Sequence, residues 1–100
     1  MFGLENRQME LIIEAIKKET AVDKAVVFGS RAMGNYKKGS DIDIALFGPR
    51  LSNRAILKLY DVLSEELPLP YVFDLLHYEE INNADLKTHI DEKGVCIFEK

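Results

Sequence analysis

Two aspartates near the middle of the chain have residue types and spacing that suit phosphate chemistry. Asp41 and Asp43 alternate with Ile42 and Ile44, with the period of two that is typical of a β-strand. Their Cα atoms are expected about 6.5 Å apart on one face of that strand. Mg²⁺ binds carboxylates together with phosphate oxygens, and paired ions about 3.5 to 4 Å apart stabilise both the attacking and the leaving oxygen of a phosphoryl transfer. The alternation therefore predicts a two-metal site.

A glycine turn ahead of these aspartates is suited to an anionic substrate. Gly29 and Ser30 follow a short apolar strand predicted for residues 25–28. Glycine lets the backbone approach a ligand closely, and the N–H groups that open a helix point toward negative charge. Arg31 adds a cation. We therefore expect this turn to hold the phosphates while the aspartates bring metal ions to their other side.

A third acid interrupts a later apolar segment. Asp74 lies in a strand predicted for residues 71–76, and the remaining residues of this strand are all apolar or aromatic. Aspartate is depleted in strands, so three aspartates in two short strands favour a functional site over a solvent-facing one. If the two strands are adjacent, Asp74 is the third metal ligand.

Amphipathic helices are expected to support these strands. Apolar residues at helical spacing predict one helix through residues 9–16 and a second through residues 56–67. Ser52 is a suitable N-cap for the second helix, and Pro68 would end it. A single helical turn around residues 30–33 is expected to follow the Gly-Ser pair.

The end of the chain completes the predicted architecture. Asn82 or Asn83 would cap a last helix, and Gly94 would take the left-handed position at its C-terminal end. Residues 95–98 would then form a last short strand. The order of elements predicts an α/β fold, with a small mixed β-sheet and helices packed mainly on one face.

Length and charge limit the classes of function. A chain of 100 residues is expected to form a single domain over residues 1–100. Thirteen basic against seventeen acidic residues give a net charge of −4, which argues against an extended nucleic-acid surface. Arg31, Lys37 and Lys38 could still form a small local basic patch, which favours a nucleotide as ligand over a polymer.

The remaining chemical groups suggest a cytoplasmic location and no further site. Cys96 is the only cysteine, so no intramolecular disulfide can form, and a zinc site is not expected. We interpret Cys96 as a small core residue and His77 and His89 as surface residues. No apolar run approaches the roughly 20 residues that span a bilayer, and no membrane association is expected.

The combined motif resembles a known family. It consists of Gly29-Ser30-Arg31-Ala32, then Gly34, then Ser40-Asp41-Ile42-Asp43. This resembles the signature of the minimal nucleotidyltransferases of the DNA polymerase beta-like superfamily, in particular the MntA-type antitoxins that are partners of HEPN-domain toxins. The resemblance covers essentially the whole chain and implies the nucleotidyltransferase fold.

The resemblance also implies roles for individual residues. Gly29 and Ser30 would hold the nucleotide triphosphate, with Arg31 on phosphate or on the partner. Asp41 and Asp43 would bind both metal ions, and Asp74 would complete the metal site near the acceptor hydroxyl. The catalytic and metal-binding residues implied are therefore Asp41, Asp43 and Asp74, and the nucleotide-binding residues are Gly29, Ser30, Arg31 and Ser40.

The implied activity is the Mg²⁺- or Mn²⁺-dependent transfer of AMP from ATP to a tyrosine hydroxyl of a HEPN-type toxin, which would make the chain an antitoxin. Two alternatives remain open: an antitoxin that neutralises its partner by binding alone, and nucleotidyl transfer to a small molecule or an RNA end. Met33 departs from the pattern, because the family often has a basic residue there. A partner or a second copy of the chain is expected to supply part of the acceptor surface.

Overall fold

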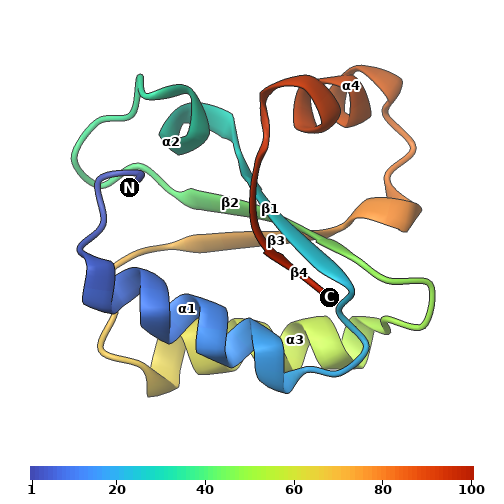
Figure 1. Ribbon diagram of the computed structural model, residues 1–100, viewed down its shortest axis with the longest axis horizontal. Helices are drawn as coiled ribbons and strands as arrows, with labels where there is room; N and C mark the ends of the chain where they lie inside the picture. The colour runs from blue at the N-terminus through green and yellow to red at the C-terminus, as the bar shows by residue number, and fades with distance from the viewer.

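Four strands form one mixed sheet at the centre of the molecule, which the computed structural model describes over residues 1–100 (Figure 1). The strand order is β3-β2-β1-β4; β1 is antiparallel to both β2 and β4, and β2 is parallel to β3. The elements are α1 (Asn6–Lys18), β1 (Lys24–Phe28), α2 (Gly29–Met33), β2 (Ile42–Phe47), α3 (Asn53–Asp61), a π-helical turn (Val62–Glu66), β3 (Phe73–His77), a 3₁₀ turn (Tyr78–Glu80), α4 (Ala84–Lys93) and β4 (Val95–Glu99). The predicted mixed α/β sheet is confirmed.

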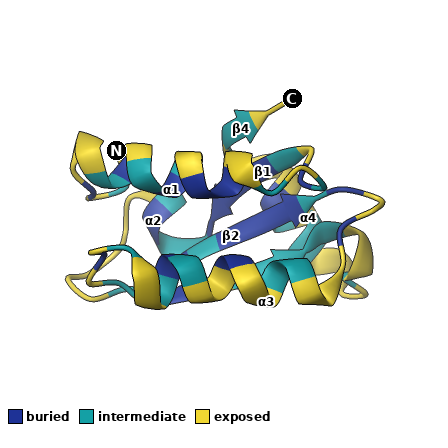
Figure 2. Ribbon diagram, turned by 90° about the horizontal axis from the view of Figure 1, so that it is seen from below, coloured by how far each residue is buried: buried dark blue, intermediate teal, exposed yellow.

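Helices α1 and α3 cover one face of the sheet and enclose the main hydrophobic core. In Figure 1 both lie below the sheet, and in Figure 2 their outer sides are exposed while their inner sides are buried. Ile44 and Leu46 of β2 point into this core because they alternate with Asp43 and Ala45 along the strand. Ile12 and Ile16, one turn apart on α1, pack against the same core; both are fully buried.

The opposite face of the sheet has a smaller cover. There α4 packs against β1, and a second cluster contains Val26, Phe28, Ala45 and Ile90. Helices α1 and α3 therefore share one face, whereas α4 lies on the other. The acidic residues of β2 and β3 share the face of α4, because Asp43 and Asp74 alternate with residues of the main core.

The signals predicted for helix ends are confirmed at two positions and wrong at a third. Ser52 Oγ accepts a hydrogen bond from the Ala55 N–H at 3.1 Å, and Asn83 Oδ1 accepts one from Leu86 N–H at 3.1 Å. Gly94 is not left-handed, since its φ is −69°. It lies in a tight contact instead: a Cβ there would come within 2.4 Å of the Ile90 carbonyl oxygen.

Two side chains lie in surroundings that differ from those predicted. Cys96 is exposed on the outer strand β4 rather than in the core. The His77 side chain is only 8 % exposed, and its Nε2 lies 2.9 Å from the carbonyl oxygen of Gly48. The His77 side chain therefore contacts the turn after β2 and is not a surface residue. No helix of the chain has the length and apolar character that crossing a bilayer would require.

Candidate active site

The three predicted acids lie at one end of the two parallel strands. Asp43 and Asp74 are paired across β2 and β3, so both side chains leave the sheet on the same face. Asp41 immediately precedes the first residue of β2 and is exposed, as is Asp74, whereas Asp43 is half-buried. The structure thus brings together the residues that the spacing and the motif had singled out.

The Gly-Ser turn lies directly beside this acidic group. Phe28, the last residue of β1, is paired with Asp43 across the sheet, and Gly29 follows it with a φ of +74°. A Cβ on Gly29 would come within 2.3 Å of the Asp43 carboxylate oxygen Oδ2. A side chain at position 29 would therefore meet both backbone strain and a clash with Asp43, which explains physically why a glycine stands here.

Burial and mutual repulsion both change the pKa of Asp43. The pKa of Asp43 is raised above its usual 3.8, chiefly because partial burial disfavours the carboxylate. The negative charges of Asp74 and Asp41 raise the pKa further, and His89 opposes them. Asp43 is therefore the centre of the acidic group electrostatically as well as in position.

The three aspartates have the oxygen ligands that a magnesium site needs, although their side chains are not arranged around a common metal position. Three carboxylates are hard oxygen ligands, and a divalent cation would relieve the repulsion that raises the pKa of Asp43. In this conformation, however, no group of three or more acidic, histidine or cysteine side chains is arranged to hold a metal. The residues fit the ion by type and by position on the sheet, and their rotamers would have to adjust.

The other predicted nucleotide-binding residues lie on α2 and at the end of the loop before β2. Ser30 is half-buried in the first turn of α2, where no side chain caps the helix. Ser40 Oγ accepts a hydrogen bond from the Lys37 N–H at 2.8 Å, so its hydroxyl closes a turn of the loop. Met33 is 48 % exposed, and Lys37 is exposed on the loop.

Arg31 lies in surroundings unlike those of a phosphate-binding residue. Its side chain is buried, with 4 % of the residue exposed. Nε donates to the Ser40 carbonyl oxygen at 2.9 Å, and Nη1 donates to that of Phe2 at 2.8 Å. In this structure the guanidinium thus binds main-chain oxygens within the protein.

The interpretation of His89 as a surface residue is wrong, because this histidine lies at the site. His89 is half-buried on α4, and its Nε2 accepts the hydrogen bond of the Gly29 N–H at 3.1 Å. Its ring also meets Phe28 edge-on, with 6.2 Å between the ring centroids. Helices α2 and α4 lie side by side here (Figure 1). No spacing signal links positions 29 and 89, because the contact depends on how α4 packs against β1.

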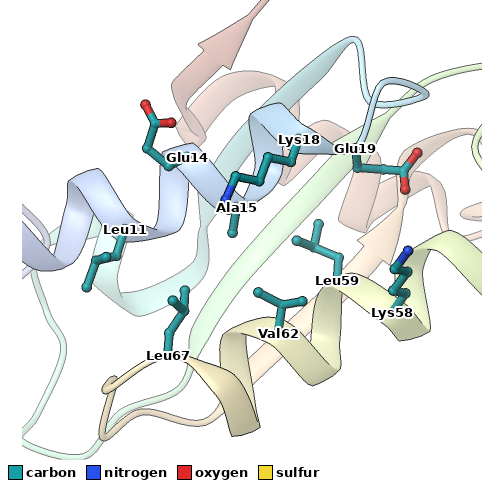
Figure 3. A pocket seen from close by; sticks show the side chains of 9 residues that line it. All are labelled: Leu11, Glu14, Ala15, Lys18, Glu19, Lys58, Leu59, Val62 and Leu67. Atoms are coloured by element: carbon teal, nitrogen blue, oxygen red, sulfur yellow. The ribbon is translucent and has the colours of Figure 1, made fainter.

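A pocket of about 320 Å³ elsewhere in the molecule is not part of this site. Figure 3 shows that it lies between α1 and α3, with Leu11, Leu59 and Leu67 directed into it and charged side chains at its rim. These helices cover the face of the sheet opposite to Asp43. The residues that line the pocket include none of the three aspartates and no part of the glycine turn.

The fold and the acidic site together define a class of protein. A mixed sheet that carries a Gly-Ser turn and an Asp-x-Asp strand next to a third acidic strand is the arrangement of a nucleotidyl-transferring domain. The family described as polymerase beta nucleotidyltransferase matches residues 10–100. The chain therefore belongs to this nucleotidyltransferase family, and no functionally curated protein matches its sequence.

Solved structures share the fold at low sequence identity. A toxin-antitoxin structure with AMP-PNP has a TM-score of 0.77 at 23 % identity, over 92 % of this chain and 73 % of that one. A structure of a tri-AMPylated Shewanella oneidensis HEPN toxin in complex with an MNT antitoxin has a TM-score of 0.73 at 20 % identity, over 97 % of this chain and 74 % of that one. At these identities the similarity establishes the fold.

Proposed function

We propose that the chain is a metal-dependent protein adenylyltransferase that moves AMP from ATP to a hydroxyl of a HEPN-type toxin and so acts as its antitoxin. Residues 1–100 would act as a single minimal domain in the cytoplasm. The observation that carries this proposal is the position of Asp43, between the Gly29 turn on one side and Asp74 on the other. A triphosphate and an acceptor could meet there.

The proposed roles follow from the neighbours of each residue. Gly29 and Ser30 would bind the triphosphate through the first turn of α2. Asp41, Asp43 and Asp74 would hold two Mg²⁺ or Mn²⁺ ions, which supply charge neutralisation for the phosphates. The acceptor oxygen would bond to the α-phosphorus of ATP while the bond from that phosphorus to the bridging oxygen breaks. Pyrophosphate would leave, and the hydroxyl proton would pass to a carboxylate or to water.

The proposed partner rests on the structures that share the fold. One of them is a complex of an MNT antitoxin with a tri-AMPylated HEPN toxin, and another contains AMP-PNP. These similarities support ATP as the donor and the toxin as the acceptor, and the family resemblance points to a tyrosine as the modified residue. The net charge of −4 agrees with a protein acceptor better than with an RNA end.

The test is to incubate the chain with ATP labelled in its α-phosphate, Mg²⁺ and the toxin encoded beside it. We expect labelled toxin, with AMP mapped to tyrosine by mass spectrometry. The Asp41→Asn/Asp43→Asn double variant should lose about a hundredfold or more of this transfer. Asp61→Asn is the matched control, because Asp61 is an exposed aspartate on the other face of the sheet.

Two results would contradict the proposal. If the double variant still silences the toxin fully while it remains folded and bound, neutralisation is by binding alone. If the label instead appears on RNA or on a small molecule, the acceptor is wrong although the reaction class stands.

A further inference from the structure

Arg31 is the one charged side chain in the buried interior of the chain. The ion pairs of the protein lie elsewhere, between Arg7 and Glu10 and between Lys100 and Asp23. Burying a cation without an anion is costly unless its donors are satisfied by hydrogen bonds. The partners of Arg31 therefore indicate what this buried charge does.

The first partner lies directly before the acidic strand. Arg31 Nε donates to the carbonyl oxygen of Ser40 at 2.9 Å, and Ser40 is followed by Asp41. Ser40 also accepts a hydrogen bond from Lys37 N–H through its hydroxyl, so the end of the loop is fixed from two sides. The main chain that carries Asp41 is in this way tied to α2, the helix that begins at Gly29.

The second set of partners reaches the strand that carries the third acid. The guanidinium carbon lies 5.1 Å from the ring centroids of both Tyr71 and Tyr36. Tyr71 stands three residues before Asp74, and its hydroxyl donates to Gln8 Oε1 at 3.0 Å. A cation over the face of an aromatic ring is favourable, and a desolvated position strengthens this interaction.

A third contact joins the N-terminal segment to the same centre. Nη1 of Arg31 donates to the Phe2 carbonyl oxygen at 2.8 Å. Gly3 lies so close to the Tyr36 ring that a Cβ there would come within 2.6 Å of it. One planar fork therefore connects the loop before β2, the segment before β3 and the N-terminal segment, which a lysine ammonium could not do with the same geometry.

We propose that Arg31 is a positioning residue that sets where Asp41 stands relative to Asp43 and Asp74, and so tunes how tightly the site binds a metal–nucleotide complex. This inference rests on the proposed function and deepens it. It assigns to Arg31 a role behind the acids, through the main chain, in place of a contact with the phosphates.

The test measures binding of Mn²⁺ in the presence of AMP-PNP by electron paramagnetic resonance, with no acceptor present. Arg31→Met should raise the half-saturating Mn²⁺ concentration about tenfold or more, in the range found when groups behind a metal ligand are removed. Arg31→Lys should share most of this loss, because it keeps the charge and loses the fork. Arg54→Met, at an exposed position of α3, is the matched control.

A second pair of variants keeps the test valid if Arg31→Met fails to fold. Tyr36→Ala removes one ring from the guanidinium at a position that is 37 % exposed, and Tyr60→Ala removes a tyrosine of 38 % exposure from α3. We expect Tyr36→Ala to raise the half-saturating concentration a few-fold and Tyr60→Ala to leave it unchanged. Circular dichroism at the assay temperature verifies that each variant is folded.

The outcomes separate this inference from the function on which it rests. If the wild-type chain binds no Mn²⁺ with AMP-PNP, the nucleotide site itself is wrong. If the wild type binds and a folded Arg31→Met binds with the same midpoint, Arg31 only stabilises the fold. Equal shifts for Tyr36→Ala and Tyr60→Ala would likewise overturn the positioning role.

Discussion

The two faces of the sheet divide the work of the molecule between stability and chemistry. The face under α1 and α3 belongs to a cluster of sixteen buried residues, whereas the face under α4 belongs to a cluster of four. Strand β2 contributes to both, since Ile44 points to the first face and Asp43 to the second. A thin cover is therefore what leaves the carboxylates of the second face open to solvent and ligands.

The two faces also have opposite effects on the free energy of unfolding. The first face removes apolar surface from water, which stabilises the fold. The second face holds a half-buried carboxylate whose pKa is raised by burial and by two neighbouring acids, which destabilises the fold when Asp43 is ionised. The large core offsets the cost of an ionised Asp43 on the other face. Substitutions on the two faces should therefore have opposite consequences.

Ile16→Ala should give the largest effect and confine it to stability. Ile16 is fully buried on α1, in the main core. The substitution is expected to cost about 2 to 5 kcal/mol in the free energy of unfolding, measured by urea denaturation. Ile13→Ala, on the same helix at a half-buried position, should cost less. If Ile16→Ala lowers AMP transfer by more than its unfolded fraction explains, the two faces are not independent.

Asp43→Asn should have the opposite effects, with a loss of activity and no loss of stability. Loss of the central carboxylate is expected to reduce AMP transfer about a hundredfold or more, equivalent to about 2.7 kcal/mol of activation free energy. Without divalent ions the variant should melt at a higher temperature than the wild type, because it removes a carboxylate held beside Asp41 and Asp74. A lower melting temperature measured in EDTA would contradict the comparison.

Gly29→Ala separates the effect of backbone strain from the effect of the contact with Asp43. Gly29 and Gly34 have nearly the same left-handed φ, +74° and +80°, so an alanine at either should cost about 1 to 2 kcal/mol of stability. Only at Gly29 would the new Cβ meet Asp43, since nothing lies within 4 Å of a Cβ at Gly34. Nucleotide-dependent Mn²⁺ binding should therefore weaken in Gly29→Ala and persist in Gly34→Ala. Equal binding in both variants would show that the contact with Asp43 is unimportant.

The parts of the fold that depend on short-range sequence patterns could be predicted from the sequence. The alternation around Asp43 fixes which side chains share a face, and the Ser52 cap and the helical turn after Gly29 depend on near neighbours alone. The pairing of Asp43 with Asp74 could be predicted only on the condition that the two strands are adjacent, because the strands lie about thirty residues apart in the sequence.

The features that sequence could not supply come from packing between distant segments. His89 reaches Gly29 only because α4 crosses the end of β1, and Gly94 is small because it packs on Val26 rather than because of its φ. The sequence predicts that Arg31 contacts phosphate or a partner, and it gives no sign of the hydrogen bonds that Arg31 makes to the N-terminal segment and to the loop before β2. Such contacts have no period and no fixed spacing.

The smallest expected effect is the pH dependence of stability that Asp43 contributes in the absence of metal. Its pKa in the unfolded chain is near 3.8 and is raised on folding, so between the two values the folded state binds more protons than the unfolded state. Stability from this group is therefore present below the unfolded pKa and is lost as the pH rises through the folded pKa. The effect should be small, because the carboxylate is only half-buried and solvent screens its neighbours.

The measurement compares the unfolding free energies of the wild type and Asp43→Asn in EDTA from about pH 4 to about pH 7. The advantage of the variant should grow with pH and then level off. Mg²⁺ should reduce that advantage, because the ion stabilises the ionised carboxylate group of the wild type alone. A difference between the two proteins that is constant across this range would mean that neither burial nor the acidic neighbours raise the pKa of Asp43 on folding, which would contradict the contrast drawn between the two faces.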